Sequence, residues 1–177
     1  MHSMSRIHSG KRAKLPADVA DMVIRGDTAG AIGRLERAYR LTGKVVEGNK
    51  IGRTLGYPTA NLEQQQSAIL PGQGVYTAFV YLHGNWYQSM VNVGIRPTLN
   101  LHHVTIEAHL FNFKGDIYGE TISIHFLEKI RNEMRFNSLS ELKAQLHTDK
   151  EHAQRAIAAL YPRLELTSNG SCLLKTP

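Results

Sequence analysis

The chain has 177 residues, 42% of them hydrophobic and 20% charged, so it has the size of one ordinary domain with enough apolar residues for a buried core. Its formal net charge of +6 favours an anionic partner, and a phosphate-bearing small molecule fits that charge as well as nucleic acid does. Its single cysteine, Cys172, excludes an internal disulfide framework, and the absence of a long apolar run or a secretory signal predicts a cytoplasmic protein without a membrane partner.

The N-terminal part of the chain is predicted to be helical up to about residue 36. Val19, Met22 and Val23 recur at helical spacing, and a second short apolar pattern follows Gly26. From Tyr39 onward the character changes to β-rich segments separated by glycine, proline and asparagine. We therefore predict two short helices followed by a boundary near residue 38.

This boundary divides the chain into three parts. Residues 1–38 form a helical extension, residues 39–162 form the main domain with its C-terminal helices, and residues 163–177 form a polar tail without a recognisable pattern. Because the main domain begins after the extension, we expect deletion of residues 1–36 to preserve its activity.

Antiparallel strands are predicted for most of the main domain. Residues 74–82 and 86–93 flank His83-Gly84-Asn85, a three-residue connection of the kind that closes a hairpin. Residues 116–126 form a further strand whose aliphatic and aromatic side chains alternate inward. Several short strands without intervening helices favour a small antiparallel barrel over a parallel sheet.

The strand at residues 105–111 carries a polar face. Its aliphatic positions alternate with polar ones, so Glu107 and His109 share the face opposite Ile106, Ala108 and Leu110. The nine histidines are otherwise scattered, with His102-His103 the only adjacent pair. We interpret the histidines as surface or turn residues and not as metal ligands.

The end of the main domain is predicted to return to helix. Ser138-x-x-Glu141 and Thr148-x-x-Glu151 have the form of two capping boxes, which indicates two helices. The first is expected to bury Leu139, and Pro162 is expected to end the second.

A glycine-rich segment at residues 48–62 is the strongest local candidate for phosphate binding. Glycines at intervals of four let the backbone bend around a phosphate chain, and Thr59 and Asn61 then offer the hard oxygens that Mg²⁺ prefers. An ordinary loop remains the alternative for this segment. A Walker-A loop is excluded, because the Gly-Lys pairs are followed by Arg12 and Val45 and not by serine or threonine.

Five motifs together resemble the riboflavin kinase family across roughly residues 39–160. They are Gly43-Lys-Val-Val-x-Gly48, Gly52-Arg-x-Leu-Gly-Tyr-Pro-Thr-Ala-Asn61, Val91-Asn-Val-Gly-Ile-Arg-Pro-Thr98, Ile106-Glu-Ala-His-Leu110 and Lys129-Ile-Arg-Asn-Glu-x-x-Phe136. The resemblance implies a mainly β fold, a small Greek-key antiparallel barrel with a C-terminal helical segment. It also implies transfer of the γ-phosphoryl group of ATP to the 5′-hydroxyl of riboflavin, which yields FMN and ADP.

The resemblance also assigns expected roles to residues. Glu107 would be the general base, and Thr59 and Asn61 would hold Mg²⁺. The residues expected at ATP are Gly48, Gly52, Arg53, Gly56, Pro58, Thr59 and Asn61, with Phe113 and Tyr118 bordering the adenine. Arg131, Glu133 and Phe136 are expected at the flavin, although the arginine and the phenylalanine fit a packing role equally well.

The N-terminal extension resembles the joint of bacterial bifunctional enzymes, in which a nucleotidylyltransferase domain precedes the kinase. Such a domain in a longer parent chain is therefore an expected partner. The His-x-Gly-His signature of that domain is absent from the sequence, so adenylylation of FMN to FAD is not expected here.

Two other classes of function compete with the kinase. A basic barrel can bind nucleic acid, but the aromatic residues here do not interleave with a stripe of lysine and arginine. A flavin sensor without catalysis is the second alternative. It has no chemical need for Thr59, Asn61 and Glu107 together.

Overall fold

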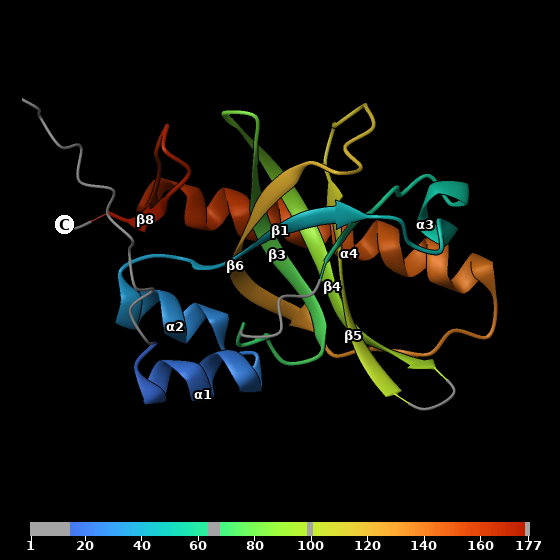
Figure 1. Ribbon diagram of the computed structural model, residues 1–177, viewed down its shortest axis with the longest axis horizontal. Helices are drawn as coiled ribbons and strands as arrows, with labels where there is room; N and C mark the ends of the chain where they lie inside the picture. The colour runs from blue at the N-terminus through green and yellow to red at the C-terminus, as the bar shows by residue number, and fades with distance from the viewer. Residues whose placement is uncertain (1–14, 64–67, 99–100, 176–177) are drawn as a thin grey trace, which may run out of the picture.

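A closed barrel of six antiparallel strands lies at the centre of the computed structural model, which describes residues 15–63, 68–98 and 101–175 (Figure 1). Around the barrel the strands follow the order β1-β2-β5-β4-β3-β6, so the chain crosses from β2 to β3 past two other strands. This topology confirms the predicted mainly β fold with a Greek-key barrel. The strands are β1 (Tyr39–Val46), β2 (Ala60–Leu62), β3 (Gly74–Leu82), β4 (Asn85–Thr98), β5 (Leu101–Leu110) and β6 (Thr121–Arg131).

The interior of the barrel is filled by the aliphatic and aromatic positions that the alternation predicted. Ile106, Ala108 and Leu110 of β5 are buried there. The rings of Tyr76 and Phe126 meet edge to face at 5.5 Å between centroids. The opposite face of β5 is thus left for polar side chains. The predictions for residues 1–14 and for the side chains of His102 and His103 fall outside the described part of the chain.

The hairpin between β3 and β4 is tighter than predicted. Leu82 pairs with Asn85, so the connection contains two residues, His83 and Gly84, and not three. Both residues have positive φ, 48° and 79°, which is the backbone form that matches the twist of paired strands. Asn85 therefore belongs to β4.

One continuous helix, α4 (Leu139–Leu160), replaces the two helices predicted near the C-terminus. Ser138 is confirmed as its N-cap, because the amide of Glu141 donates to Ser138 Oγ at 3.1 Å, while the Glu141 carboxylate accepts from the amide of Asn137. The second predicted box is wrong: Thr148 lies inside the helix and its hydroxyl donates to the carbonyl of Ala144. No glycine or proline interrupts the segment, so nothing ends the helix before a 3₁₀ turn at Tyr161–Arg163.

Helix α4 lies along the outer face of β3 and β4, behind the barrel in Figure 1. Ala153 packs there with Met90 and Phe111, and Ile157 packs with Phe79. Leu139, predicted to be buried, is 61% exposed, because the first residue of the helix lies beyond this contact. No helix in the described ranges is both apolar enough and long enough to span a bilayer.

The N-terminal helices α1 (Ala17–Arg25) and α2 (Thr28–Leu35), both predicted, pack against the barrel. Val19, Val23 and Ala31 belong to the same core cluster as the residues of the barrel interior. A hydrogen bond from the amide of Gly72 to the carbonyl of Val23 joins α1 to the segment before β3. The helical extension therefore shares the core of the main domain.

The C-terminal segment, in which the sequence shows no recognisable pattern, forms a hairpin of β7 (Leu164–Leu166) and β8 (Cys172–Leu174). Leu164 and Cys172 are buried with Phe79 and Ile157 in a second core cluster. The amide of Ala38 donates to the carbonyl of Cys172, which joins the hairpin to the start of the barrel. Strands of three residues are too short for an alternation pattern to reveal them.

Candidate active site

A row of paired residues crosses the outer face of the barrel and carries the polar side chains of the site. Glu107 of β5 is paired with Asn61 of β2 on one side and with Asn92 of β4 on the other. Asn92 is paired with Val75 of β3, and Val75 with Arg131 of β6. Because directly opposite residues of a ladder lie about 5 Å apart at Cβ, Glu107 stands between two amide side chains.

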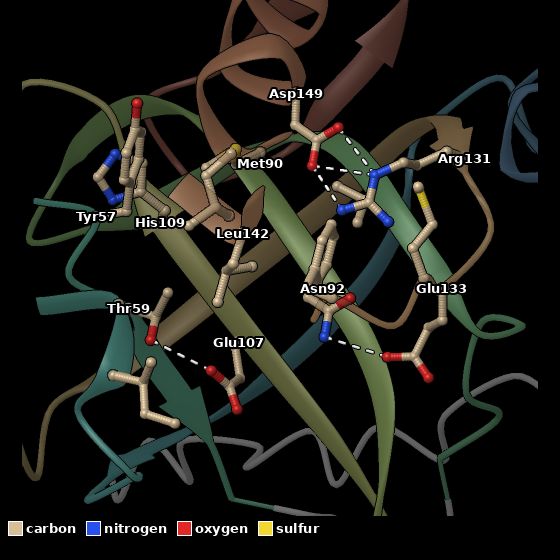
Figure 2. A pocket seen from close by; sticks show the side chains of 16 residues that line it. Tyr57, Thr59, Met90, Asn92, Glu107, His109, Arg131, Glu133, Leu142 and Asp149 are labelled. Atoms are coloured by element: carbon tan, nitrogen blue, oxygen red, sulfur yellow. Dashed lines mark hydrogen bonds and ion pairs between the residues drawn. The ribbon is translucent and has the colours of Figure 1, made fainter. Parts of the chain in front are cut away.

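The first cavity, of about 250 Å³, lies between this face and the N-terminal half of α4. Its apolar walls come largely from Met90, Met134, Phe136, Leu142 and Leu146. Its polar walls come from Thr59, Asn92, Glu107, Arg131, Glu133 and Asp149. Figure 2 shows Thr59 and Glu107 on one side of this cavity and Arg131 and Asp149 on the opposite side.

The second cavity, of about 330 Å³, opens at the end of the barrel beside the glycine-rich segment. Val45, Ala60, Ala108 and Leu110 give it an apolar floor that belongs to the barrel wall. Its rim comes mainly from Arg53, Pro58, Thr59, Phe113, Lys114 and Tyr118. It thus combines two cations and the carboxylate of Asp116 with two aromatic rings.

Thr59 lines both cavities. Its hydroxyl donates to Glu107 Oε2 at 3.4 Å, a long hydrogen bond that leaves the pair adjustable (Figure 2). A group bound in one cavity and a group bound in the other would therefore approach each other beside this threonine and this carboxylate. Such an arrangement suits the transfer of a group between two bound molecules.

Close contacts explain why two positions of the glycine-rich segment have no room for a side chain. A Cβ on Gly52 would stand 2.3 Å from the carbonyl oxygen of Tyr57, whose own amide donates to the carbonyl of Gly52. A Cβ on Gly48 would stand 2.2 Å from the Asn61 amide nitrogen. The loop, with the short helix α3 (Ile51–Thr54), thus closes on itself and places Thr59 at the residue before β2 and Asn61 within β2.

His109 fixes the same segment from the other side. Its Nδ1 lies 2.7 Å from the carbonyl oxygen of Pro58, and because a carbonyl only accepts, Nδ1 carries the hydrogen. The ring also meets that of Tyr57 edge to face. Burial lowers the pKa of His109, which favours the neutral ring. His109 and His125 are both buried, so the prediction of surface or turn histidines is wrong for these two.

The structure brings most of the predicted site residues together. Thr59, Glu107, Arg131, Glu133 and Phe136 line the first cavity, which Gly52 also borders. Arg53, Pro58, Thr59, Phe113 and Tyr118 line the second cavity. Gly48, Gly56 and Asn61 line neither cavity.

Sequence reasoning missed Asn92, His109 and Asp149 as site residues. Asn92 stands between Val91 and Val93 in β4 and is paired with Glu107, so the pairing of β4 with β5 would have pointed to it. Asp149 occurs on α4 at helical spacing from Leu142 and Leu146, as a charge within an apolar stripe. A charge in such a stripe indicates a buried partner, which here is Arg131.

The oxygens of Thr59, Asn61 and Glu107 form a mixed set of hydroxyl, amide and carboxylate donors, which suits Mg²⁺ bound together with phosphate oxygens. Within the described ranges, no group of three or more His, Cys, Asp and Glu side chains is placed to hold a metal ion.

Comparison with protein families gives a match to the sequence model of riboflavin kinase over residues 35–157. The bifunctional riboflavin kinase/FMN adenylyltransferase of Haemophilus influenzae is 42% identical over 121 residues, which are 68% of this chain and 39% of that protein. The protein of the same name from Bacillus subtilis is 37% identical over 138 residues, or 76% and 44% of the two chains. The chain spans less than half the length of these relatives.

Solved structures resemble the fold. A chain described as a macrolide-efflux protein from Streptococcus pneumoniae matches with a TM-score of 0.75 at 33% identity, over 82% of this chain and 48% of that one. The riboflavin kinase of Trypanosoma brucei matches with a TM-score of 0.50 at 24% identity, over 69% and 81%. At 24% identity, the similarity to the Trypanosoma brucei structure concerns the fold alone.

Proposed function

Because the chain belongs to the riboflavin kinase family, we propose that it transfers the γ-phosphoryl group of ATP to the 5′-hydroxyl of riboflavin. The observation that carries the proposal is the position of Thr59, which lines both cavities and donates to Glu107. A two-substrate transfer needs two binding sites that meet at one point, with a base at that point.

We assign the flavin to the first cavity. Its walls are largely apolar, as an isoalloxazine ring requires, and Phe136 offers a ring face for contact. Glu133 and Asn92 supply polar groups that can fix the orientation of the ring. The ribityl chain would then extend toward Thr59 and Glu107, on the side opposite Arg131 and Asp149 (Figure 2).

We assign ATP to the second cavity. Arg53 and Lys114 offer positive charge to the phosphates, and Phe113 and Tyr118 offer apolar faces to the adenine. Lys50, whose ammonium lies 5.7 Å from the centre of the Tyr118 ring, adds a further cation at the rim. The charge around this cavity accounts for part of the basic character of the chain.

Thr59 and Asn61 would hold Mg²⁺ together with the phosphates of ATP. The ion would supply neutralisation of the charge that develops on the transferred group. Gly48 keeps the Asn61 amide in place, because any larger side chain would displace it. Asn61 lines neither cavity, so its proposed role is that of a metal ligand.

Glu107 would accept the proton of the 5′-hydroxyl as that oxygen attacks the γ-phosphorus. The residue projects from the outer face of β5 beside Thr59, in reach of a hydroxyl bound in the first cavity. Thr59 orients the carboxylate through its hydrogen bond. No adenylylation of FMN is proposed for this chain, although the relatives' names also include that activity.

The direct test is product analysis of the purified chain with riboflavin, ATP and Mg²⁺. We expect chromatography to show FMN and ADP in equal amounts, with no FAD. Omitting ATP or adding a chelator should abolish FMN formation. Binding of riboflavin without formation of FMN would contradict the proposal and favour a flavin sensor.

A further inference from the structure

Three residues that line the first cavity come from a single segment without a helix or a strand. This segment, residues 132–137, connects β6 to α4 and contributes Glu133, Met134 and Phe136 to the cavity. We call it the cavity loop. Since it lacks a ladder or a helical turn of its own, its position depends on the contacts that its neighbours make.

Arg131 holds the cavity loop at its start. Its Nη1 donates to the carbonyl of Asn132 at 2.9 Å, and its guanidinium carbon lies 5.9 Å from the centre of the Phe136 ring. At the other end the amide of Asn137 donates to Glu141 Oε2, which is part of the helix cap. Between them, Asn92 reaches Glu133 only at 3.5 Å. Arg131 is thus the main contact between the barrel and the loop.

Asp149 in turn fixes Arg131. Its carboxylate accepts from Arg131 Nε at 2.9 Å and from Nη2 at 2.7 Å, and this two-point contact sets the plane of the guanidinium. Gln145 Nε2 donates to the same carboxylate at 2.8 Å. The side chain of Asp149 is only 1% exposed, so water does not compete for these bonds.

We propose that Asp149 is a positioning residue for the ligand of the first cavity, acting through Arg131 on the cavity loop. Removing its charge would free the guanidinium, and the loop would lose the contact that places Phe136. The pairing also neutralises Arg131 at the far side of the cavity, which suits an uncharged ring better than an anionic group. This inference rests on the proposed function in that it takes the ligand to be riboflavin.

The second cavity allows a positioning role of Asp149 to be distinguished from a structural role. Neither Asp149 nor Arg131 nor any residue of the cavity loop lines it. Loss of the Asp149 carboxylate should therefore weaken the binding of riboflavin and leave the binding of Mg·ATP unchanged. If Asp149 had only a structural role, its loss would weaken the binding of both substrates or of neither.

The test compares Asp149→Asn with Glu151→Gln, which makes the same change from carboxylate to amide on the exposed face of the same helix. Riboflavin affinity is measured by quenching of flavin fluorescence, and KM is measured for both substrates. For Asp149→Asn we expect the Kd and KM of riboflavin to rise about 10-fold or more, the usual scale for a hydrogen bond to a charged group, with KM for Mg·ATP unchanged. Glu151→Gln should match the unmodified chain. Unchanged riboflavin affinity in folded Asp149→Asn, or an equal loss for both substrates, would overturn the inference.

Arg131→Lys covers the case in which Asp149→Asn does not fold. It keeps the positive charge beside Asp149 but removes the planar fork that joins Asp149, Asn132 and Phe136. The Kd and KM of riboflavin are again expected to rise while KM for Mg·ATP stays unchanged, and the absence of this selective rise would overturn the inference. If the unmodified chain binds riboflavin but makes no FMN, the proposed function fails, while the affinity comparison still decides the role of Asp149.

Discussion

The Thr59 hydroxyl lies 3.4 Å from Glu107 Oε2, at the place where the two cavities meet. Glu107 lies in β5, and Thr59 directly precedes β2, the strand that pairs with β5 there. The glycine-rich segment folds back on itself to bring the two residues together. In the proposed function, the 5′-hydroxyl and the γ-phosphoryl group would meet at this point.

Asn61→Ala is expected to raise the Mg²⁺ concentration needed for activity, with little change in riboflavin binding. The substitution removes one hard oxygen at the proposed metal site and leaves the first cavity intact, because Asn61 does not line it. The measurement is the rate of FMN formation as Mg²⁺ is varied. Asn61→Asp, which keeps an oxygen at the same position, is the control, and an unaltered Mg²⁺ dependence in Asn61→Ala would remove this residue from the metal site.

His109→Leu and His109→Asn form a matched pair of nearly equal size. Asn can place its amide nitrogen where Nδ1 of His109 stands, whereas Leu leaves the carbonyl of Pro58 without this donor. We expect kcat to fall by up to about 10-fold further in the Leu variant, because a typical hydrogen bond contributes roughly 0.5–1.5 kcal/mol and Thr59 follows Pro58 directly. Equal kcat in the two variants would show that only the ring of His109 matters.

The periodic parts of the fold could be predicted from the sequence, and the irregular parts could not. The strand alternation correctly placed Ile106, Ala108 and Leu110 inside and Glu107 outside, because a period of two leaves one face for each set. The hairpin at the C-terminus was missed, since its strands are short and its stability comes from contacts with Ala38 and Phe79 far away in the sequence.

The site shows the same division. Thr59 in the glycine-rich segment and Glu107 on β5 belong to local motifs, so the sequence could single them out, and both line the first cavity. Asp149 was missed because its role depends on contact with Arg131, which is 18 positions earlier in the sequence. Only the packing of α4 on the barrel brings the two residues together. The flavin role predicted for Arg131 must accordingly include its ion pair with Asp149.

Deletion of residues 1–36 is expected to destabilise the domain, contrary to the expectation from sequence alone. The deletion removes Val19, Val23 and Ala31 from the barrel core, and burying a side chain of the size of valine contributes about 1.5–3 kcal/mol. Thermal unfolding of residues 37–177 measures the effect. A matched pair of point variants localises it: Val23→Ala at a fully buried position should lower Tm, and Ile24→Ala at a position 56% exposed should not. An unchanged Tm after the deletion would show that the extension is dispensable.

His125 is expected to make the stability of the domain depend on pH. Burial lowers its pKa to about 3, helped by the charges of Arg40 and Arg37, and neither ring nitrogen has a hydrogen-bond partner among the described residues. As pH falls below the ordinary value near 6.5, the unfolded chain takes up a proton that the folded chain does not, so the folded state loses stability. At pH 5 this loss is roughly 2 kcal/mol.

His125→Leu removes this proton uptake and should therefore reduce the fall in Tm between pH 8 and pH 5. The exposed His152 on α4 provides the control, and His152→Gln should retain the pH dependence of the unmodified chain. Parallel pH profiles for His125→Leu and the unmodified chain would refute the assignment.

The central claim is that Glu107 serves as the base where the two cavities meet, and Glu107→Gln tests it most directly. The substitution keeps the shape of the side chain and removes its basicity, so riboflavin and Mg·ATP should still bind. The decisive measurement is kcat for FMN formation at saturating substrates, with riboflavin affinity and Tm determined on the same sample. We predict a fall in kcat of at least about 10²-fold, the lower end of the range for a positioned base, with unchanged binding and Tm. A kcat within a few-fold of the unmodified chain would contradict the account.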